Sequence, residues 1–349
     1  MKALLAAATS AVAAAACTPP ALLPDLKQAE DHVHAGEWDA ALAAYDDAIE
    51  SCKAVKDETR GRETCAQAHL GRAELLDRMG RHEDAAAAYE ATPAAIDDDP
   101  VASCNATYRA GKIRLDLGQL VPAYQLLWRA ITDYPDAPAA DNALRVLLLD
   151  GRRRAPAELY EQLQLLADRL TNTEIGDNLL YSMADLAKTE LGDAAAALAI
   201  YDRMVEAYPT GALFDDALWH GAALARAAGD ARGAVARYRK LLATREVAWL
   251  NGSYNSEWFD NSWLQIGITL RDDLRDFERA LNAFRQIPKD YPASILLDDA
   301  MFEQAVTYER MGSRDRACRA LSKLHEKWPD SKYELERGPN MRERLRCKL

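Results

Sequence analysis

The sequence predicts an all-α fold, a right-handed α-solenoid of about eight helix pairs. Three observations lead to this prediction: a turn pattern that recurs along the chain, aromatic–proline pairs at a fixed distance from it, and an apolar content supplied largely by alanine. Alanine favours helices, whereas aromatic and β-branched residues are too sparse here for a sheet of any size. With 349 residues and 49% hydrophobic composition, the chain can bury a large core.

The recurring pattern is clearest in residues 192–209, which read GDAAAALAIYDRMVEAYP. Its turn position falls at Gly36, Gly80, Gly118, Gly151, Gly192, Gly229, Arg275 and Gly312. Five residues later the chain has Ala41, Ala85, Ala123, Pro156, Ala197, Ala234, Ala280 and Ala317. Nine residues after the turn it has Tyr45, Tyr89, Leu127, Tyr160, Tyr201, Tyr238, Phe284 and Leu321. Glycine permits a tight turn, the small residue lets two helices approach, and the bulky residue fills the space between them. The spacing of 33 to 46 residues is typical of helical solenoids.

Proline marks the end of the second helix in four pairs, because it lacks an N–H and disfavours helical geometry in the residue before it. The four sites are Tyr134-Pro135, Tyr208-Pro209, Tyr291-Pro292 and Trp328-Pro329. In three of them an aspartate follows the proline by six residues, and we expect it to cap the next helix. These aspartates are Asp141, Asp215 and Asp298. The doublets Asp215-Asp216 and Asp298-Asp299 therefore fit capping better than acid/base catalysis.

These residues resemble the tetratricopeptide repeat (TPR), and the resemblance covers nearly all of residues 26–336. The long connection after each proline is similar to that of periplasmic envelope proteins, first the C-terminal repeat domain of the Tol–Pal accessory protein and then the BamD-like lipoproteins. The resemblance implies a non-enzymatic scaffold that binds a protein or peptide partner in the concave groove of the solenoid. The alternative is an architectural subunit of an envelope complex, such as outer-membrane assembly or Tol–Pal, held by broad surface contact.

Residues 1–16, MKALLAAATSAVAAAA, carry one lysine and a small apolar run that is too short to span a bilayer, which indicates a secretory signal peptide. Ala14-Ala15-Ala16-Cys17 resembles a lipobox, so Cys17 is the expected site of acylation and residues 17–25 the lipid-anchored tether. Ordinary cleavage after Ala16 with an unmodified Cys17 is the alternative. On the first interpretation the protein is exported, periplasmic and anchored to the outer membrane.

Two long connections are expected between the helix pairs, at residues 53–62 and 245–260. The second contains four aromatic residues, with a fifth just beyond it: Trp249, Tyr254, Trp258, Phe259 and Trp263. They either fold back onto the solenoid or form a recognition surface, since tryptophan and tyrosine are enriched at interface hot spots. As a further alternative, residues 249–263 stack on sugar rings and make the protein a cell-wall (peptidoglycan)-binding module.

The first helices of successive pairs are expected to supply further partner-binding residues. By position in the repeat, the candidates are Tyr108, Arg109, Tyr181, Trp219 and Trp263. The fourth pair is the poorest match, because Pro156 replaces the packing alanine and residues 150–154, DGRRR, are expected to form a basic turn. After the eighth pair, Gly338-Pro339 is expected to break the last helix, and residues 337–349 to form a basic tail or capping helix.

Five cysteines follow Cys17: Cys52, Cys65, Cys104, Cys318 and Cys347. In an exported protein these are candidates for disulfides. Cys52 and Cys65 flank the connection at 53–62, but Cys104 holds nearly the same repeat position as Cys65, so a Cys65–Cys104 bridge competes with Cys52–Cys65. Cys318 can pin the C-terminal segment through Cys347. Five cysteines leave at least one thiol unpaired.

No catalytic, cofactor-binding or metal-binding pattern stands out. The six histidines are scattered, and His32 and His34, two apart on a helix, point to different faces. A Gly-rich phosphate loop and the H-E-x-x-H and G-x-S-x-G motifs are missing, and the aspartates at 97–99 read as a capping turn. The net charge of −12 argues against nucleic-acid binding. We therefore expect no enzyme activity, no cofactor and no metal.

Overall fold

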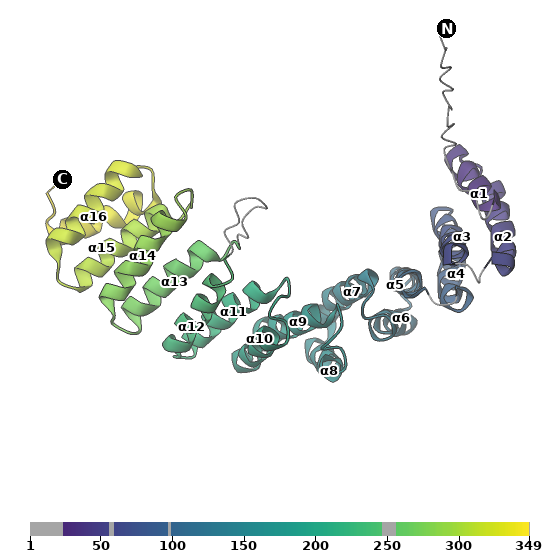
Figure 1. Cartoon of the computed structure of the whole chain (residues 1–349), viewed down its shortest axis with the longest axis horizontal. Coiled ribbons are helices and arrows are strands. Elements are labelled where there is room, and N and C mark those ends of the chain that lie inside the picture. The colour runs from purple at the N-terminus through teal and green to yellow at the C-terminus, as the bar shows by residue number, and fades with distance from the viewer. Residues whose placement is uncertain (1–23, 56–58, 97–98, 246–255, 349) are drawn as a thin grey trace, which may run out of the picture. The chain divides into compact units, whose positions relative to one another are not determined.

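The computed structural model describes residues 24–55, 59–96, 99–245 and 256–348, and these residues form helices without any strand (Figure 1). The predicted all-α class and the eight helix pairs are confirmed. The expected signal peptide at 1–16, Cys17 and the tether as far as residue 23 lie outside the described residues. Within the described ranges, no helix is both long enough and apolar enough to cross a membrane.

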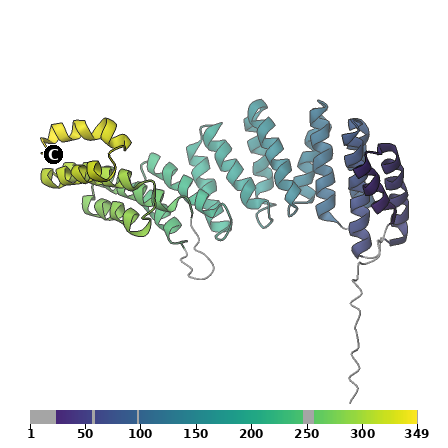
Figure 2. The same ribbon diagram turned by 90° about the horizontal axis from the view of Figure 1, so that it is seen from above.

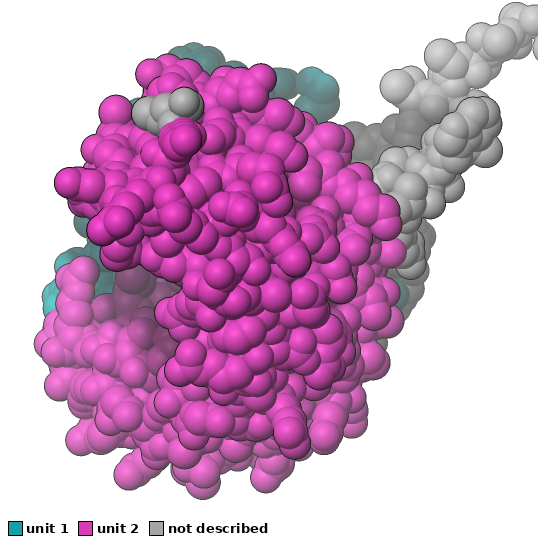
Figure 3. All heavy atoms as spheres, turned by 90° about the vertical axis from the view of Figure 1, so that its left-hand side faces the viewer, with its two compact units in different colours: residues 1–143 teal, residues 144–349 magenta. Residues whose placement is uncertain are grey.

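The chain divides into two compact units, residues 1–143 and 144–349. Unit 1 contains α1 (Pro24–Ala35), α2 (Trp38–Val55), α3 (Thr59–Arg78), α4 (His82–Ala95), α5 (Pro100–Asp116), α6 (Leu120–Asp133) and the start of α7 (Pro138–Arg154). Unit 2 continues with α8 (Pro156–Ala167), α9 (Gly176–Thr189), α10 (Ala194–Ala207), α11 (Phe214–Ala227) and α12 (Ala231–Leu242). It ends with α13 (Phe259–Asp272), α14 (Phe277–Asp290), α15 (Leu297–Arg310), α16 (Arg314–Lys327), the π-helix η1 (Tyr333–Arg337) and α17 (Gly338–Leu345). Within each unit, helices lie side by side in chain order (Figure 2), and the surface of unit 2 is hollowed on one side (Figure 3).

The turn between the two helices of a pair needs a left-handed backbone, and the turn residues supply it. Six of the predicted turn glycines have φ between 68° and 87°. Arg275, which stands at this position in the seventh pair, also has a positive φ, 56°. The turn geometry is therefore imposed by the packing of the pair, and arginine accepts there a conformation that glycine adopts more easily. The seven predicted packing alanines are all fully buried.

The fourth pair departs from the prediction. Residues 150–154 are the last residues of helix α7 instead of a basic turn, and Gly151 is helical. The N-cap of α8 is Ala155, and the buried residues four and eight positions later are Leu159 and Leu163, in place of the expected Pro156 and Tyr160. A Cβ on Gly151 would lie 2.8 Å from Leu159 Cδ2. The small residue of this pair has thus moved to the first helix, where it makes room for a leucine on the second.

Four aspartates act as N-caps in the described part of the chain, and Asp215 and Asp298 are not among them. Asp99, Asp193, Asp230 and Asp276 each accept a hydrogen bond from a backbone N–H in the first turn of their helix. The capping role expected for Asp215 and Asp298 is wrong, because α11 and α15 have Leu213 and Leu296 at the N-cap.

Asp215 and Asp298 instead close their own helix pair. The hydroxyl of Thr244 donates to Asp215 Oδ1 at 3.2 Å, and that of Ser331 to Asp298 Oδ2 at 2.6 Å. Ser294 makes the matching bond to Asp260 at 2.6 Å. Each hydroxyl lies in the connection that leaves the second helix of the pair. The repeated aspartate therefore fastens that connection to the first helix.

Two disulfides are present among the described cysteines, Cys52–Cys65 and Cys318–Cys347, and Cys104 is a buried free thiol. The competing Cys65–Cys104 bridge is not formed. The connection expected at 53–62 is shorter than predicted, because α2 continues to Val55 and α3 begins at Thr59.

The C-terminal segment covers the last helix pair. Tyr333 stacks on Phe302 with ring centroids 4.2 Å apart, and Met341 is buried against the same cluster of α15 and α16. Arg314 donates to the carbonyl of Arg346 at 2.7 Å, and Arg344 pairs with Glu309 at 2.9 Å. Gly338-Pro339 opens helix α17 instead of ending one. Of the two alternatives for this segment, the structure has the capping helix, and the cap begins at Tyr333.

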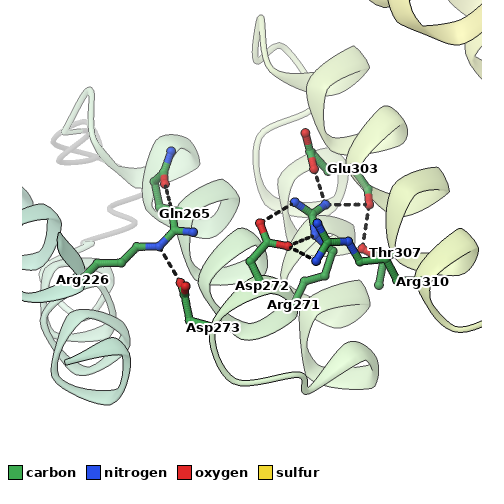
Figure 4. A network of polar contacts seen from close by, with 8 residues as sticks. All are labelled: Arg226, Gln265, Arg271, Asp272, Asp273, Glu303, Thr307 and Arg310. Atoms are coloured by element: carbon green, nitrogen blue, oxygen red, sulfur yellow. Dashed lines mark hydrogen bonds and ion pairs between the residues drawn. The ribbon is translucent and has the colours of Figure 1, made fainter. Parts of the chain in front are cut away.

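A charged network joins α13 to α15 (Figure 4). Arg271 is 5% exposed; it donates to both carboxylate oxygens of Asp272, at 2.8 and 3.0 Å, and pairs with Glu303, which is 8% exposed. Arg310 adds a second cation, 2.9 Å from Asp272 Oδ1. Two cations and two carboxylates thus neutralise one another between the seventh and eighth pairs, so neither buried charge is left without a partner.

Candidate functional site

The structure brings three of the predicted partner-binding residues together in unit 2. Tyr181 lies on α9, Trp219 on α11 and Trp258 at the N-cap of α13, and all three are partly exposed. Tyr201, His220 and Tyr238 join them through ring contacts. We call these six residues the aromatic cluster.

One half of the aromatic cluster is a pair of stacked indoles. The rings of Trp219 and Trp258 lie 4.7 Å apart with an interplanar angle of 13°. Trp258 Nε1 donates to Asp216 Oδ1 at 3.1 Å, which fixes the orientation of the indole. The ring of Tyr238 lies 5.3 Å from that of Trp219, tilted by 58°. Trp258, at the N-cap of α13, thus lies against α11, the first helix of the preceding pair.

The other half is built around Tyr201, a fully buried residue of α10. Its ring stacks on His220 at 5.8 Å and meets the edge of Tyr181 at 5.9 Å. The hydroxyl of Tyr201 has no hydrogen-bond partner among the described residues. His220 lies 6.2 Å from Trp258, so the two halves are continuous, and the partly exposed rings of Tyr181, Trp219, His220 and Trp258 form their surface.

Two carboxylates border the aromatic cluster, and they differ in their partners. Burial disfavours the ionised form of Asp185, yet hydrogen bonds from Arg152 at 2.7 Å and Lys188 at 3.2 Å lower its pKa below the usual value. Asp216 accepts only the Trp258 indole N–H and has no cation beside it within the described ranges. Burial, and then the positive charge of Lys188, lower the pKa of His220. His220 is therefore neutral at neutral pH.

The remaining predicted residues fall elsewhere. Trp249 and Tyr254 lie outside the described residues. Phe259 is 1% exposed and belongs to the core, so its ring offers no surface to a partner. Trp263 is partly exposed on α13 and packs with Trp219 against the core of the sixth and seventh pairs.

Tyr108 and Arg109, on α5, line a separate pocket in unit 1. The pocket has a volume of about 650 Å³ and is also lined by Asp77, His82 and Lys112. Arg109 donates to the hydroxyl of Tyr89 at 3.1 Å and lies 3.4 Å from Glu74. Lys112 pairs with Asp116 at 3.2 Å. The two cations of the pocket are therefore already paired within the protein.

Sequence reasoning missed His220 and the role of Tyr201. Tyr201 occupies the bulky repeat position and was expected only to fill the space between two helices. Its position directly after Trp219, itself a predicted partner-binding residue, was the one sequence feature that could have pointed to His220. Across the described parts of the chain, no group of three histidine, cysteine or carboxylate side chains is placed to hold a metal ion.

Comparison with known proteins gives one match by sequence profile. The profile of the tetratricopeptide repeat matches residues 261–294 and 299–331. These ranges correspond to the pairs α13–α14 and α15–α16. A search of curated proteins gave no match.

Several solved structures match this chain at low identity and low TM-score. MamA 41-end from Desulfovibrio magneticus RS-1 is 15% identical with a TM-score of 0.41, over 55% of this chain and 97% of that one. PilW, a type IV pilus biogenesis factor, is 14% identical with a TM-score of 0.38, over 77% and 96%. A tetratricopeptide repeat protein from Parabacteroides merdae is 11% identical with a TM-score of 0.32, over 92% and 97%.

Proposed function

This chain is a tetratricopeptide-repeat protein, and from that premise we propose that it is a non-enzymatic scaffold for a protein or peptide partner. The fold is one of protein–protein interaction: stacked helix pairs present the side chains of successive first helices to a ligand. We place the partner on the aromatic cluster, which combines residues of α9, α11 and α13.

The observation that carries this proposal is the exposure of the paired indoles. Trp219 and Trp258 are large, rigid and partly exposed, and each is held in one orientation by its neighbours. Ordered aromatic side chains lose little conformational entropy when a partner binds, which is why tryptophan and tyrosine dominate interface hot spots.

The proposal includes an envelope location. The disulfides Cys52–Cys65 and Cys318–Cys347 support it, because such bridges persist in oxidising compartments outside the cytosol. Together with the apolar run at 1–16, they favour an exported protein that Cys17 anchors to the outer membrane by acylation.

The membrane anchor is tested by metabolic labelling. Cells supplied with radiolabelled palmitate are expected to label the wild-type protein and not Cys17→Ala, and the variant is expected to move from the membrane to the soluble periplasmic fraction. Label that persists in Cys17→Ala, or a wild-type protein recovered unlabelled from the cytosol, contradicts this part of the proposal.

Partner binding is tested by site-specific photocrosslinking in native cells. A photoreactive phenylalanine analogue replaces Tyr181 or Trp263, on the first helices, or Glu206, an exposed residue of α10. We expect a discrete adduct from the first two positions, identifiable by mass spectrometry, and none from Glu206. The adduct from Tyr181 should be lost when Trp219→Ala and Trp258→Ala are combined.

Two other outcomes decide for the alternatives. Adducts from all three positions that survive the double substitution indicate an architectural subunit held by broad contact. Retention on purified peptidoglycan that is lost in Trp258→Ala, without any protein adduct, indicates the cell-wall-binding module.

A further inference from the structure

The aromatic cluster has a carboxylate, Asp216, that no side-chain cation among the described residues pairs with; Asp216 lies in the first turn of α11. Asp185 is paired with Arg152 and Lys188, whereas Asp216 accepts only the neutral N–H of Trp258. A carboxylate fixed beside aromatic rings in a partly desolvated setting gains from a cation placed next to it. Asp216 is therefore the residue of the cluster beside which a cation from a partner would be most favourable.

The rings around Asp216 present faces of the kind that attract cations. Trp219 and Trp258 are stacked, and Tyr181 and His220 lie on the same continuous surface, all partly exposed. The π face of an indole or phenol carries partial negative charge, and tryptophan is the strongest cation–π partner among the side chains. A lysine or arginine laid across this surface would meet both the rings and the carboxylate.

The surroundings of Tyr201 show that this part of the aromatic cluster is negatively charged. The residue is fully buried, its oxygen has no partner within the described ranges, and burial together with Tyr181, Asp185 and Asp216 raises its pKa. The negative charges of Asp185 and Asp216 thus act on the interior of the aromatic cluster as well as on its exposed rings, and such a field favours a cation over a neutral group.

We propose that the aromatic cluster binds a lysine or arginine side chain of the partner, with Asp216 as its counter-ion and Trp219 and Trp258 as the stacking surface. This inference rests on the proposed scaffold function and names the chemistry of the partner: a segment with an exposed basic residue. The overall charge of −12 acts in the same direction, because it draws a basic segment toward the protein.

The test uses small probes, so that it does not depend on the identity of the partner. The full chain, labelled with ¹⁵N, is titrated with acetyl-Gly-Arg-Gly-amide and with the same peptide carrying citrulline, which has nearly the same shape without the charge. The indole N–H signals of Trp219 and Trp258 are assigned from Trp219→Phe and Trp258→Phe. We expect the arginine peptide to shift both signals with saturation and to bind at least tenfold more tightly than the citrulline peptide.

Asp216→Asn is the decisive variant, because the amide oxygen can still accept from Trp258 Nε1 while the charge is gone. We expect it to reduce the affinity for the arginine peptide about tenfold, the effect of roughly 1.4 kcal/mol. Glu206→Gln removes an exposed charge from α10 and is expected to leave the affinity unchanged. Circular dichroism checks that each variant is folded.

Equal binding of the arginine and citrulline peptides, or an affinity that Asp216→Asn leaves unchanged, overturns this inference. The scaffold proposal is judged separately. If the photocrosslinked partner meets the aromatic cluster through a segment without lysine or arginine, the scaffold proposal stands and the cation site is refuted.

Discussion

In unit 2, the first helices of neighbouring pairs contact each other in two different ways, through the aromatic cluster and through the charged network. The aromatic cluster joins α9, α11 and α13 through rings, leaves the hydroxyl of Tyr201 unpaired and remains partly exposed. The charged network joins α13 to α15 through Arg271 and Glu303, which are buried and paired. Complete pairing is what a structural contact requires. A binding contact instead offers an ordered, partly exposed surface with a carboxylate that no side-chain cation pairs with. The difference between the two contacts therefore distinguishes a structural role from a functional one.

The largest effect is expected from Glu303→Ala in the charged network. The substitution leaves Arg271 buried with one partner fewer, and we expect it to reduce the free energy of unfolding by about 3 kcal/mol. Urea unfolding followed by tryptophan fluorescence measures the loss. The exposed pair Asp276–Arg279 is the control, because Arg279→Ala should cost less than about 0.5 kcal/mol.

Replacing both members of the buried pair tests whether the loss of stability in Glu303→Ala comes from leaving the charge of Arg271 without this partner. Arg271→Met combined with Glu303→Leu removes both charges, and Asp272 keeps Arg310 as its partner. We expect the double variant to recover most of the stability lost in Glu303→Ala, since apolar residues of similar volume often replace a buried ion pair without cost. A double variant as unstable as the single one would show that the network holds the helices through its charges.

Tyr201→Phe is expected to act in the opposite direction. It removes the unpaired hydroxyl and keeps the ring, so the free energy of unfolding should rise by about 1 kcal/mol. Tyr333→Phe is the matched control, because that hydroxyl donates to Asp299 at 2.6 Å and its loss should destabilise the protein by about 1–2 kcal/mol. The same sign for both substitutions would mean that Tyr201 has a partner after all.

The smallest effect concerns pH. The pKa of His220 is lowered in the folded protein by burial and by Lys188, although Asp216 and Asp185 act against the shift. As the pH falls below the ordinary histidine value of about 6.5, the unfolded chain takes up a proton before the folded one does, so stability decreases. His220→Phe should flatten this dependence between pH 7 and pH 5. The remaining slope belongs to other groups, among them His69, whose pKa is also lowered by burial.

The fold was largely predictable because the turn and packing positions repeat. The fourth pair was placed wrongly because Gly151 suggested a turn, while its physical role is to make space for Leu159. Asp215 was assigned to capping because the sequence cannot show that Thr244, 29 residues further on, returns to the same aspartate.

The candidate site was predictable only in part. The unusual aromatic content identified Trp258, and the repeat position identified Tyr181 and Trp219. His220 was missed because its position in the repeat gave no reason to single it out, and only the packing of the fifth helix pair against the sixth brings it onto Tyr201.

The burial of Cys104 bears on whether the two disulfides keep their present pairing. Disulfides rearrange when a thiolate attacks a bridged sulfur, and a thiol that stays protonated cannot begin the exchange. Burial raises the pKa of Cys104 to about 12, so at neutral pH roughly one molecule in 10⁵ carries the reactive form. In the folded chain the thiol of Cys104 therefore does not react. The packing that buries Cys104 also protects the Cys52–Cys65 disulfide from exchange with it.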